Sequence, residues 1–183
     1  MFAIALSESA KLSPLEPWQV EEFLAHMDRA RPNLDPWIPW AQRSTDLESA
    51  RAALQSYADR QAADAGRLFG IWSEGVLVGG VMFVSFSKAT GVCEIGVWLE
   101  PAAEGKGLVS AAVSRLIDYA FDDRGMSRIE WHTSPANTRS GAVAQRMGMT
   151  LEGTLREAFL HQGVRHDTQV WSLLPSDRTA SGS

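Results

Sequence analysis

The chain has 183 residues and a formal net charge of −5, with 17 Lys and Arg against 22 Asp and Glu. This length suits one domain with its own core; we expect a single domain over residues 1–175 and a disordered tail over 176–183. The acidic balance argues against nucleic-acid binding, which needs concentrated Lys and Arg, and mildly favours cationic partners such as amines. No stretch has the roughly 18 apolar residues of a membrane span, and we expect a cytoplasmic protein.

The N-terminal part predicts one strand and one helix. Residues 1–16 suit a strand, and Pro17 suits the first turn of a helix that ends at 31–33. The segment 32–43 is too rich in proline for a helix and too aromatic for a solvated linker. Its two tryptophans, Trp37 and Trp40, could simply pack in the core beneath a loop. The helix carries its apolar residues on one face: Val20, Phe23, Leu24 and Met27.

A second helix and a hairpin follow. Thr45 and Glu48 fit a capping box, and the helix is closed by Gly66. Strands are expected at 67–72 and 76–87, joined by a turn at 73–75. The expected buried face of the helix comprises Leu47, Leu54 and Tyr57.

The central stretch reads as strand, glycine turn and helix. Residues 92–100 are mostly β-branched and apolar, which suits a strand buried on both faces. We expect the single cysteine there, Cys93, to be a buried inert thiol. Glycines at 105 and 107 could merely turn the chain, or could aim helix-start N–H groups at a phosphate. Neither a P-loop nor a dinucleotide fingerprint is present. The following helix shows apolar residues at three- and four-residue spacing: Leu108, Ala111, Ala112, Leu116, Tyr119 and Ala120.

The C-terminal part predicts a strand at 127–133, a helix capped by Asn137 and closed by Gly148, and strands at 151–160 and 166–174. The full order is β-α-α-β-β-β-α-β-α-β-β.

Three motifs carry a family resemblance. EGKGLVS, at 104–110, resembles the acetyl-CoA-binding motif of GNAT acetyltransferases. SPANTRSGAVAQRMGMTLEGTLRE and NLDPWIPW are similar to stretches of the RimJ/RimL-type branch. The resemblance implies a mixed α/β fold: a twisted sheet with helices on both faces, in which the central strand and its neighbour at 127–133 splay apart around the pantetheine arm.

The resemblance implies an N-acetyltransferase that uses acetyl-CoA, and its favoured acceptor is the N-terminal α-amino group of a protein or peptide. A small-molecule amine such as an antibiotic is equally consistent with the motifs. A non-catalytic acyl-CoA-binding module is the alternative from another class. Family habit implies a homodimer.

Acyl transfer to an amine requires a base, donors for the developing oxyanion and a proton for the thiolate. Glu94 is the candidate base, because it is the carboxylate of the central strand and its apolar neighbours would raise its pKa; a structural salt bridge is the competing interpretation. Ser140 matches the serine of the branch motif and is the candidate partner of the CoA sulfur, since no tyrosine follows Asn137. A purely local role at the helix start is its alternative.

The resemblance also assigns residues to the cofactor. Glu104 stands where the motif usually has Gln or Arg, and its negative charge would repel the pyrophosphate unless Lys106 offsets it. Val109 stands where the motif has Gly or Ala, and its side chain adds bulk near the pyrophosphate. A backbone N–H near Val97 or Trp98 would serve the oxyanion. The full set is Val97, Trp98, Leu99, Glu104, Gly105, Lys106, Gly107, Leu108, Val109, Ser110 and Asn137.

For the acceptor amine, the resemblance implies that Trp37 and Trp40 wall a cleft. Glu157 and His166 fall on strands near the same side and are weaker alternatives for the base. The remaining histidines show no metal-ligand spacing, and we expect no metal: His26, His132 and His161.

Overall fold

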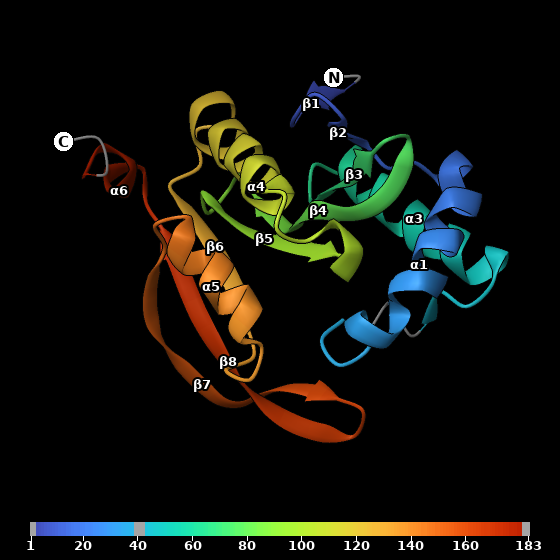
Figure 1. The fold of residues 1–183 in the computed structure, drawn as a ribbon. Helices are drawn as coiled ribbons and strands as arrows, with labels where there is room; N and C mark the ends of the chain where they lie inside the picture. Colours follow the sequence, from blue (N-terminus) through green and yellow to red (C-terminus); the bar gives the residue numbers. More distant parts are fainter. Residues whose placement is uncertain (1–2, 39–42, 181–183) are drawn as a thin grey trace.

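The computed structural model describes residues 3–38 and 43–180 (Figure 1). Within them one mixed eight-stranded sheet runs in the order β1-β2-β3-β4-β5-β6-β8-β7. Its only parallel pair in this part of the chain is β5 with β6. The strands are β1 Ile4–Ala5, β2 Ala10–Pro14, β3 Arg67–Ser73, β4 Val76–Ser87, β5 Val92–Leu99, β6 Arg128–Thr133, β7 Thr150–His161 and β8 Val164–Leu173.

Helices cover both faces of the sheet, which confirms the predicted mixed α/β class. Helices α1 (Val20–Leu34) and α3 (Leu47–Ala62) pack on β3 and β4 from one side. Helices α4 (Leu108–Asp118) and α5 (Thr138–Arg146) cover β4, β5 and β6 from the other (Figure 1). None of the helices in the described ranges is both long and apolar enough to cross a bilayer.

The sheet splits between β5 and β6. Their pairing runs from Val92 opposite Arg128 to Glu94 opposite Glu130, and covers three register pairs. Beyond that point β5 continues along β4 as far as Leu99, while β6 follows β8. The two strands therefore diverge (Figure 1), as the resemblance implied. Side chains alternate along β5, so Cys93 and Ile95 enter the core beneath α4, whereas Trp98 belongs to the core beneath α1 and α3.

Trp98 packs across a glycine of the neighbouring strand. A Cβ at Gly80 would lie 2.1 Å from the Trp98 ring, so only glycine leaves room for the indole. The indole Nε1 donates a hydrogen bond to Nε2 of His26, at 2.9 Å. His26 Nδ1 in turn lies 3.3 Å from an Oε2 atom of Glu100, just past the end of β5. This network fixes α1 to the last residues of the central strand.

His26 should make the fold sensitive to acid. Burial lowers the pKa of its imidazole to about 4 from 6.5, although Glu100 opposes the shift. The unfolded chain therefore binds a proton at higher pH than the folded one, so stability is complete above pH 6.5 and is lost as the pH falls toward 4. We expect a loss of up to about 3 kcal/mol in the free energy of unfolding, measured by urea denaturation. His26→Gln should flatten this slope; an equal slope in both proteins would contradict the assignment.

Two helix boundaries differ from those predicted. Helix α1 continues through Pro32 to Leu34, because proline removes only its own N–H and the ladder resumes where Asp35 N–H donates to Arg31 O at 2.9 Å. The cap of α3 lies one residue later than expected: Asp46 accepts from Ser49 N–H at 2.8 Å. Leu47, expected in the core, is 44% exposed, because this shift places it at the first helical position.

The chain ends also differ. Where one strand was predicted over residues 1–16, the described part, from residue 3 onward, forms two paired strands, β1 and β2. The predicted disordered tail begins instead with a short helix, α6 (Pro175–Ala180). Arg178 of α6 forms ion pairs with Asp118 at 2.9 Å and Asp122 at 2.8 Å, at the end of α4. These partners lie far away in the sequence, so composition alone could not indicate them.

Candidate active site at the splayed strands

The glycine turn before α4 has the geometry of an anion site. Gly105 and Gly107 have φ values of 77° and 72°, in the left-handed region that disfavours other residues. Gly107 is the N-cap of α4, and a Cβ at either glycine would meet no atom within 4 Å. The space in front of the turn is therefore open, and the first N–H groups of the helix have no intrahelical partners. Such a terminus attracts phosphate.

The two departures from the family motif cause no obstruction here. Glu104 is exposed and forms an ion pair with Arg139 of α5, at 2.9 Å. The cation beside its carboxylate is thus Arg139, where the sequence had suggested Lys106. Val109 is half-buried and packs against the core, so its bulk does not fill the turn.

Helix α5 brings two arginines to the turn that sequence reasoning missed. Arg139 pairs with Glu104, and Arg146 donates a hydrogen bond to Ser110 Oγ at 3.2 Å. They are seven residues apart and thus share a helix face, a spacing that could have indicated them. Together they add positive charge beside the α4 terminus.

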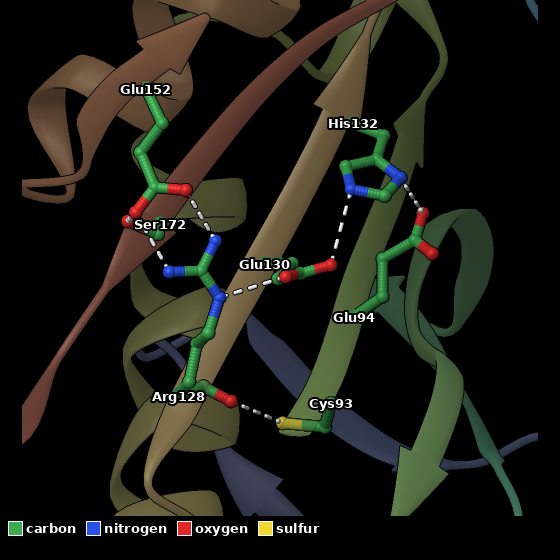
Figure 2. Close-up of polar contacts among 7 residues, drawn as sticks. All are labelled: Cys93, Glu94, Arg128, Glu130, His132, Glu152 and Ser172. Carbon is green, nitrogen blue, oxygen red and sulfur yellow. Dashed lines mark hydrogen bonds and ion pairs between the residues drawn. The ribbon is translucent and has the colours of Figure 1, made fainter. Parts of the chain in front are cut away.

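The second part of the site lies where β5 and β6 separate (Figure 2). Glu94 and Glu130 are opposite one another in the last register pair. His132 follows two residues later on the same face of β6, and Figure 2 shows its imidazole between the two carboxylates. Nδ1 lies 3.6 Å from Glu94 Oε1, and Nε2 lies 3.2 Å from Glu130 Oε2. In the sequence, the Glu-x-His alternation indicates that Glu130 and His132 share one face of a strand. Metal-ligand spacing alone does not reveal this pair.

The surroundings of Glu94 raise its pKa. Burial is the main cause and the charge of Glu130 adds to it, while His132 and Arg60 act in the opposite direction. The Glu94 side chain remains 22% exposed, so a reactant can reach it. A reachable carboxylate with a raised pKa suits proton abstraction near neutral pH.

Arg60 belongs to a hollow on the same side of the sheet. Its guanidinium donates to the Val84 carbonyl and lies 5.4 Å from the centre of the Tyr57 ring. Both side chains line a cavity of about 510 Å³ between α1 and α3. The charge of Arg60 also acts on Glu94 from this side and lowers its pKa.

A chain of polar contacts continues from Glu130 across the sheet (Figure 2). Arg128 Nε donates to Glu130 Oε1 at 2.7 Å, and both Arg128 terminal nitrogens donate to Glu152, at 2.7 and 2.5 Å. Ser172 donates to Glu152 at 2.7 Å. Hydrogen bonds from Arg128 and Ser172 lower the pKa of Glu152 to about 2. Through its contacts with both carboxylates, Arg128 holds Glu130 in one position.

Ser140 lies at the start of α5, on the other face of β6. Its N–H donates to Asn137 Oδ1 at 3.2 Å, the local contact that the sequence left open. Its hydroxyl oxygen accepts from Trp131 Nε1 at 2.9 Å, which leaves the hydroxyl hydrogen able to donate to another group. Trp98 was assigned to the cofactor, but its side chain is buried against His26, so only its backbone can serve there.

The residues expected on the acceptor side lie around the end of α1 and the β7–β8 hairpin. His161 Nε2 lies 2.8 Å from Asp35 O, two residues before Trp37, which is 38% exposed. Trp40 lies outside the described residues. Glu157 sits at an irregularity of β7 with a φ of 52°, and the His166 ring lies 6.4 Å from that of His161. His161 thus joins the end of α1 to the β7–β8 hairpin, which carries Glu157 and His166.

Cys93 is not a nucleophile of this site. The thiol is buried, and burial raises its pKa to about 12. Its sulfur lies 3.9 Å from the Arg128 carbonyl, on the core face of the paired strands.

Comparison with known proteins agrees with this geometry. Residues 11–150 match the acetyltransferase (GNAT) domain family. The chain is 28% identical to the putative ribosomal N-acetyltransferase YdaF of Bacillus subtilis, over 95% of this chain and 96% of that protein. It is 26% identical to the ribosomal-protein-serine acetyltransferase of Escherichia coli, over 92% and 94%. Its fold matches that of RimL, a ribosomal L7/L12 alpha-N-protein acetyltransferase in complex with coenzyme A, with a TM-score of 0.87 at 22% identity over 94% and 97% of the two chains. The chain belongs to the GNAT acetyltransferase family, as its motifs predicted.

Proposed function

We propose that this protein transfers the acetyl group of acetyl-CoA to the N-terminal α-amino group of a protein or peptide. The observation that carries the proposal is Glu94, a reachable carboxylate with a raised pKa at the split of the sheet. The names of the two relatives above, which specify ribosomal proteins, support the acceptor class. We place this activity in the cytoplasm, in one domain.

The residues present fit acetyl-CoA. The N–H groups at the start of α4 would bind the pyrophosphate, aided by Arg139 and Arg146. The pantetheine arm would run in the gap between β5 and β6, beside Val97 and Leu99. Ser140, whose hydroxyl hydrogen can still donate, would face the sulfur.

In the proposed reaction, Glu94 takes a proton from the acceptor amine directly or through a water. An α-amino group titrates near 8, so its deprotonation costs only about 1 kcal/mol near neutral pH. The neutral amine nitrogen then attacks the thioester carbonyl carbon and the C–N bond forms. As the C–S bond breaks, the nitrogen loses its second proton to water. The electron pair leaves on sulfur, which Ser140 stabilises with a hydrogen bond and which finally takes a proton from water. Positioning supplies much of the rate enhancement.

We place the acceptor chain between the segment after α1, with Trp37, and the β7–β8 hairpin, with Glu157 and His166. The contact between His161 and Asp35 supports this placement, because it joins the two segments. We also propose a homodimer through the edge strand β7. Its support is a row of exposed apolar side chains on that strand: Leu151, Leu155, Phe159 and Leu160.

Calorimetric titration with acetyl-CoA tests the cofactor site. We expect micromolar-range binding, weakened at least about tenfold by Gly107→Trp, because the indole would fill the space in front of the N–H groups. Gly75→Trp is the matched control: its φ of 82° and open surroundings resemble those of Gly107, but it lies in the β3–β4 turn. Equal affinities in all three proteins would contradict the assigned turn.

Thiol release on an amine panel tests the acceptor. Peptides that begin with serine or alanine should be acetylated at their α-amino groups, as mass spectrometry would show. Turnover on spermidine or kanamycin alone would favour a small-molecule enzyme. Binding of acetyl-CoA without turnover on any amine would favour the non-catalytic module.

A further inference from the structure

His132 has no part in the reaction described so far, although it contacts the proposed base. Its imidazole lies between Glu94 and Glu130, with one ring nitrogen facing each carboxylate (Figure 2). A neutral imidazole has one N–H and one lone pair, and its partners select which nitrogen carries the hydrogen.

Glu130 selects the tautomer. It is the closer carboxylate, 3.2 Å from Nε2, and its other oxygen already accepts from Arg128. Since an ionised carboxylate can only accept, Nε2 carries the hydrogen. The lone pair is then on Nδ1, which faces Glu94 Oε1 at 3.6 Å. A carboxylate that positions one nitrogen so that the other can take a proton is the logic of a catalytic triad.

The exposure of the two side chains indicates the direction in which a proton would move, from Glu94 to His132 and then to solvent. The His132 side chain is 33% exposed and that of Glu94 22%, so the imidazole is the more accessible of the two to water. The other charged and titratable groups that face Glu94 are Arg60 and Tyr57 on α3 and Glu130 on β6. Among these groups, His132 has a ring nitrogen directed at Glu94, 3.6 Å from its Oε1, and imidazole is a common proton shuttle in proteins.

We propose that His132 accepts from Glu94 the proton taken from the acceptor amine and releases it to solvent, and that Glu130 is the positioning residue for its imidazole. This inference rests on the proposed acetyl transfer. It implies a base of two groups, in which Glu94 is regenerated within each turnover.

The proton balance is closed. The amine N–H bond breaks, and its proton moves to a Glu94 oxygen and then to His132 Nδ1, which makes the imidazole a cation beside two carboxylates. Water removes this proton from the imidazolium. The second proton of the nitrogen also passes to water and the CoA sulfur takes up one proton, so each turnover on an ammonium acceptor releases one proton to solvent. No oxidant or other reactant is needed.

Chemical rescue tests the relay. With a serine-initiated peptide and acetyl-CoA, His132→Ala should lower kcat about tenfold at pH 7 with an unchanged KM for acetyl-CoA. Added imidazole should restore most of that loss, and the deficit should shrink toward pH 9, where hydroxide can remove the proton. Glu8→Gln, an exposed change in the β1–β2 turn, is the control and should show neither effect.

Glu130→Gln tests the positioning role by a second readout. NMR of the His132 ring should show the Nε2–H tautomer in the unmodified protein and a mixture in Glu130→Gln, whatever the acceptor. Transfer by the unmodified protein without imidazole rescue in His132→Ala, or with an Nδ1–H tautomer, would overturn the relay and leave the proposed function intact. Absence of transfer to any amine would overturn the proposed function, and the relay with it.

Discussion

Glu94→Gln is expected to lower kcat for peptide acetylation by about 100- to 1000-fold, the range for loss of a positioned general base. The glutamine amide has the size of the carboxylate but cannot accept a proton from the amine. Affinity for acetyl-CoA should be unchanged, since the glycine turn that we assign to its phosphates is on a different segment. Steady-state kinetics, with calorimetric titration of the cofactor, would measure both quantities.

The pH profile distinguishes a base from a structural ion pair. The base must be ionised, so kcat/KM of the unmodified protein should fall as the pH drops through the raised pKa of Glu94. In Glu94→Gln that limb should disappear. If the variant retains more than half of the activity and only unfolds more readily, Glu94 serves the sheet through its contact with His132 and the assigned role is wrong. Glu8→Gln again controls for loss of a negative charge.

Gly80→Val should destabilise the protein by about 4 kcal/mol, the sum of overpacking and of lost polar contacts in the core. The new Cβ would lie 2.1 Å from the Trp98 ring and 2.6 Å from the Phe69 carbonyl oxygen, and backbone cannot yield as a flexible side chain does. Displacement of the indole would also break its bond to His26, which is buried. Urea denaturation at pH 7.5 would give the free energy of unfolding.

Gly153→Val provides a matched comparison. Gly153 also lies in a strand, β7, but no atom lies within 4 Å of its hypothetical Cβ. The substitution there should change the free energy of unfolding by less than about 1 kcal/mol. Similar losses at both positions would show that the effect comes from strand glycine in general and not from the space that Trp98 requires.

Strand boundaries were predicted best where the chain gives a local signal. The strand at 76–87 was predicted with the bounds that the structure shows, and the central strand, predicted over 92–100, ends one residue earlier. Their β-branched and apolar runs are bounded by glycine-containing turns. Helix ends were less accurate. Whether α1 passes Pro32 depends on the packing of Leu34 in the core, and whether residues 175–180 are ordered depends on Arg178 meeting α4. Neither contact is encoded nearby in the sequence.

The candidate site divides in the same way. Gly105, Gly107 and Glu94 could be identified because their residue types are unusual for their positions. The Glu-x-His alternation indicates that Glu130 and His132 share one face of a strand, but their proximity to Glu94, 38 positions before His132, arises only through the register of two parallel strands. Arg139 likewise acquires its partner only when α5 packs beside the turn. Pairwise geometry across elements was the missing information.

The brief pairing of β5 with β6 affects how the protein unfolds. Three register pairs join the sheet from β1 to β5 to the part from β6 to β8, and the other contacts between the two parts are made by side chains. Because the strand pairing across this junction is short, we expect the two parts to open as separate cooperative units in amide hydrogen exchange. A cofactor bound across the gap between β5 and β6 would contact both parts and stabilise them against separate opening. The protection of β6 and β8 amides from hydrogen exchange should therefore rise with cofactor concentration.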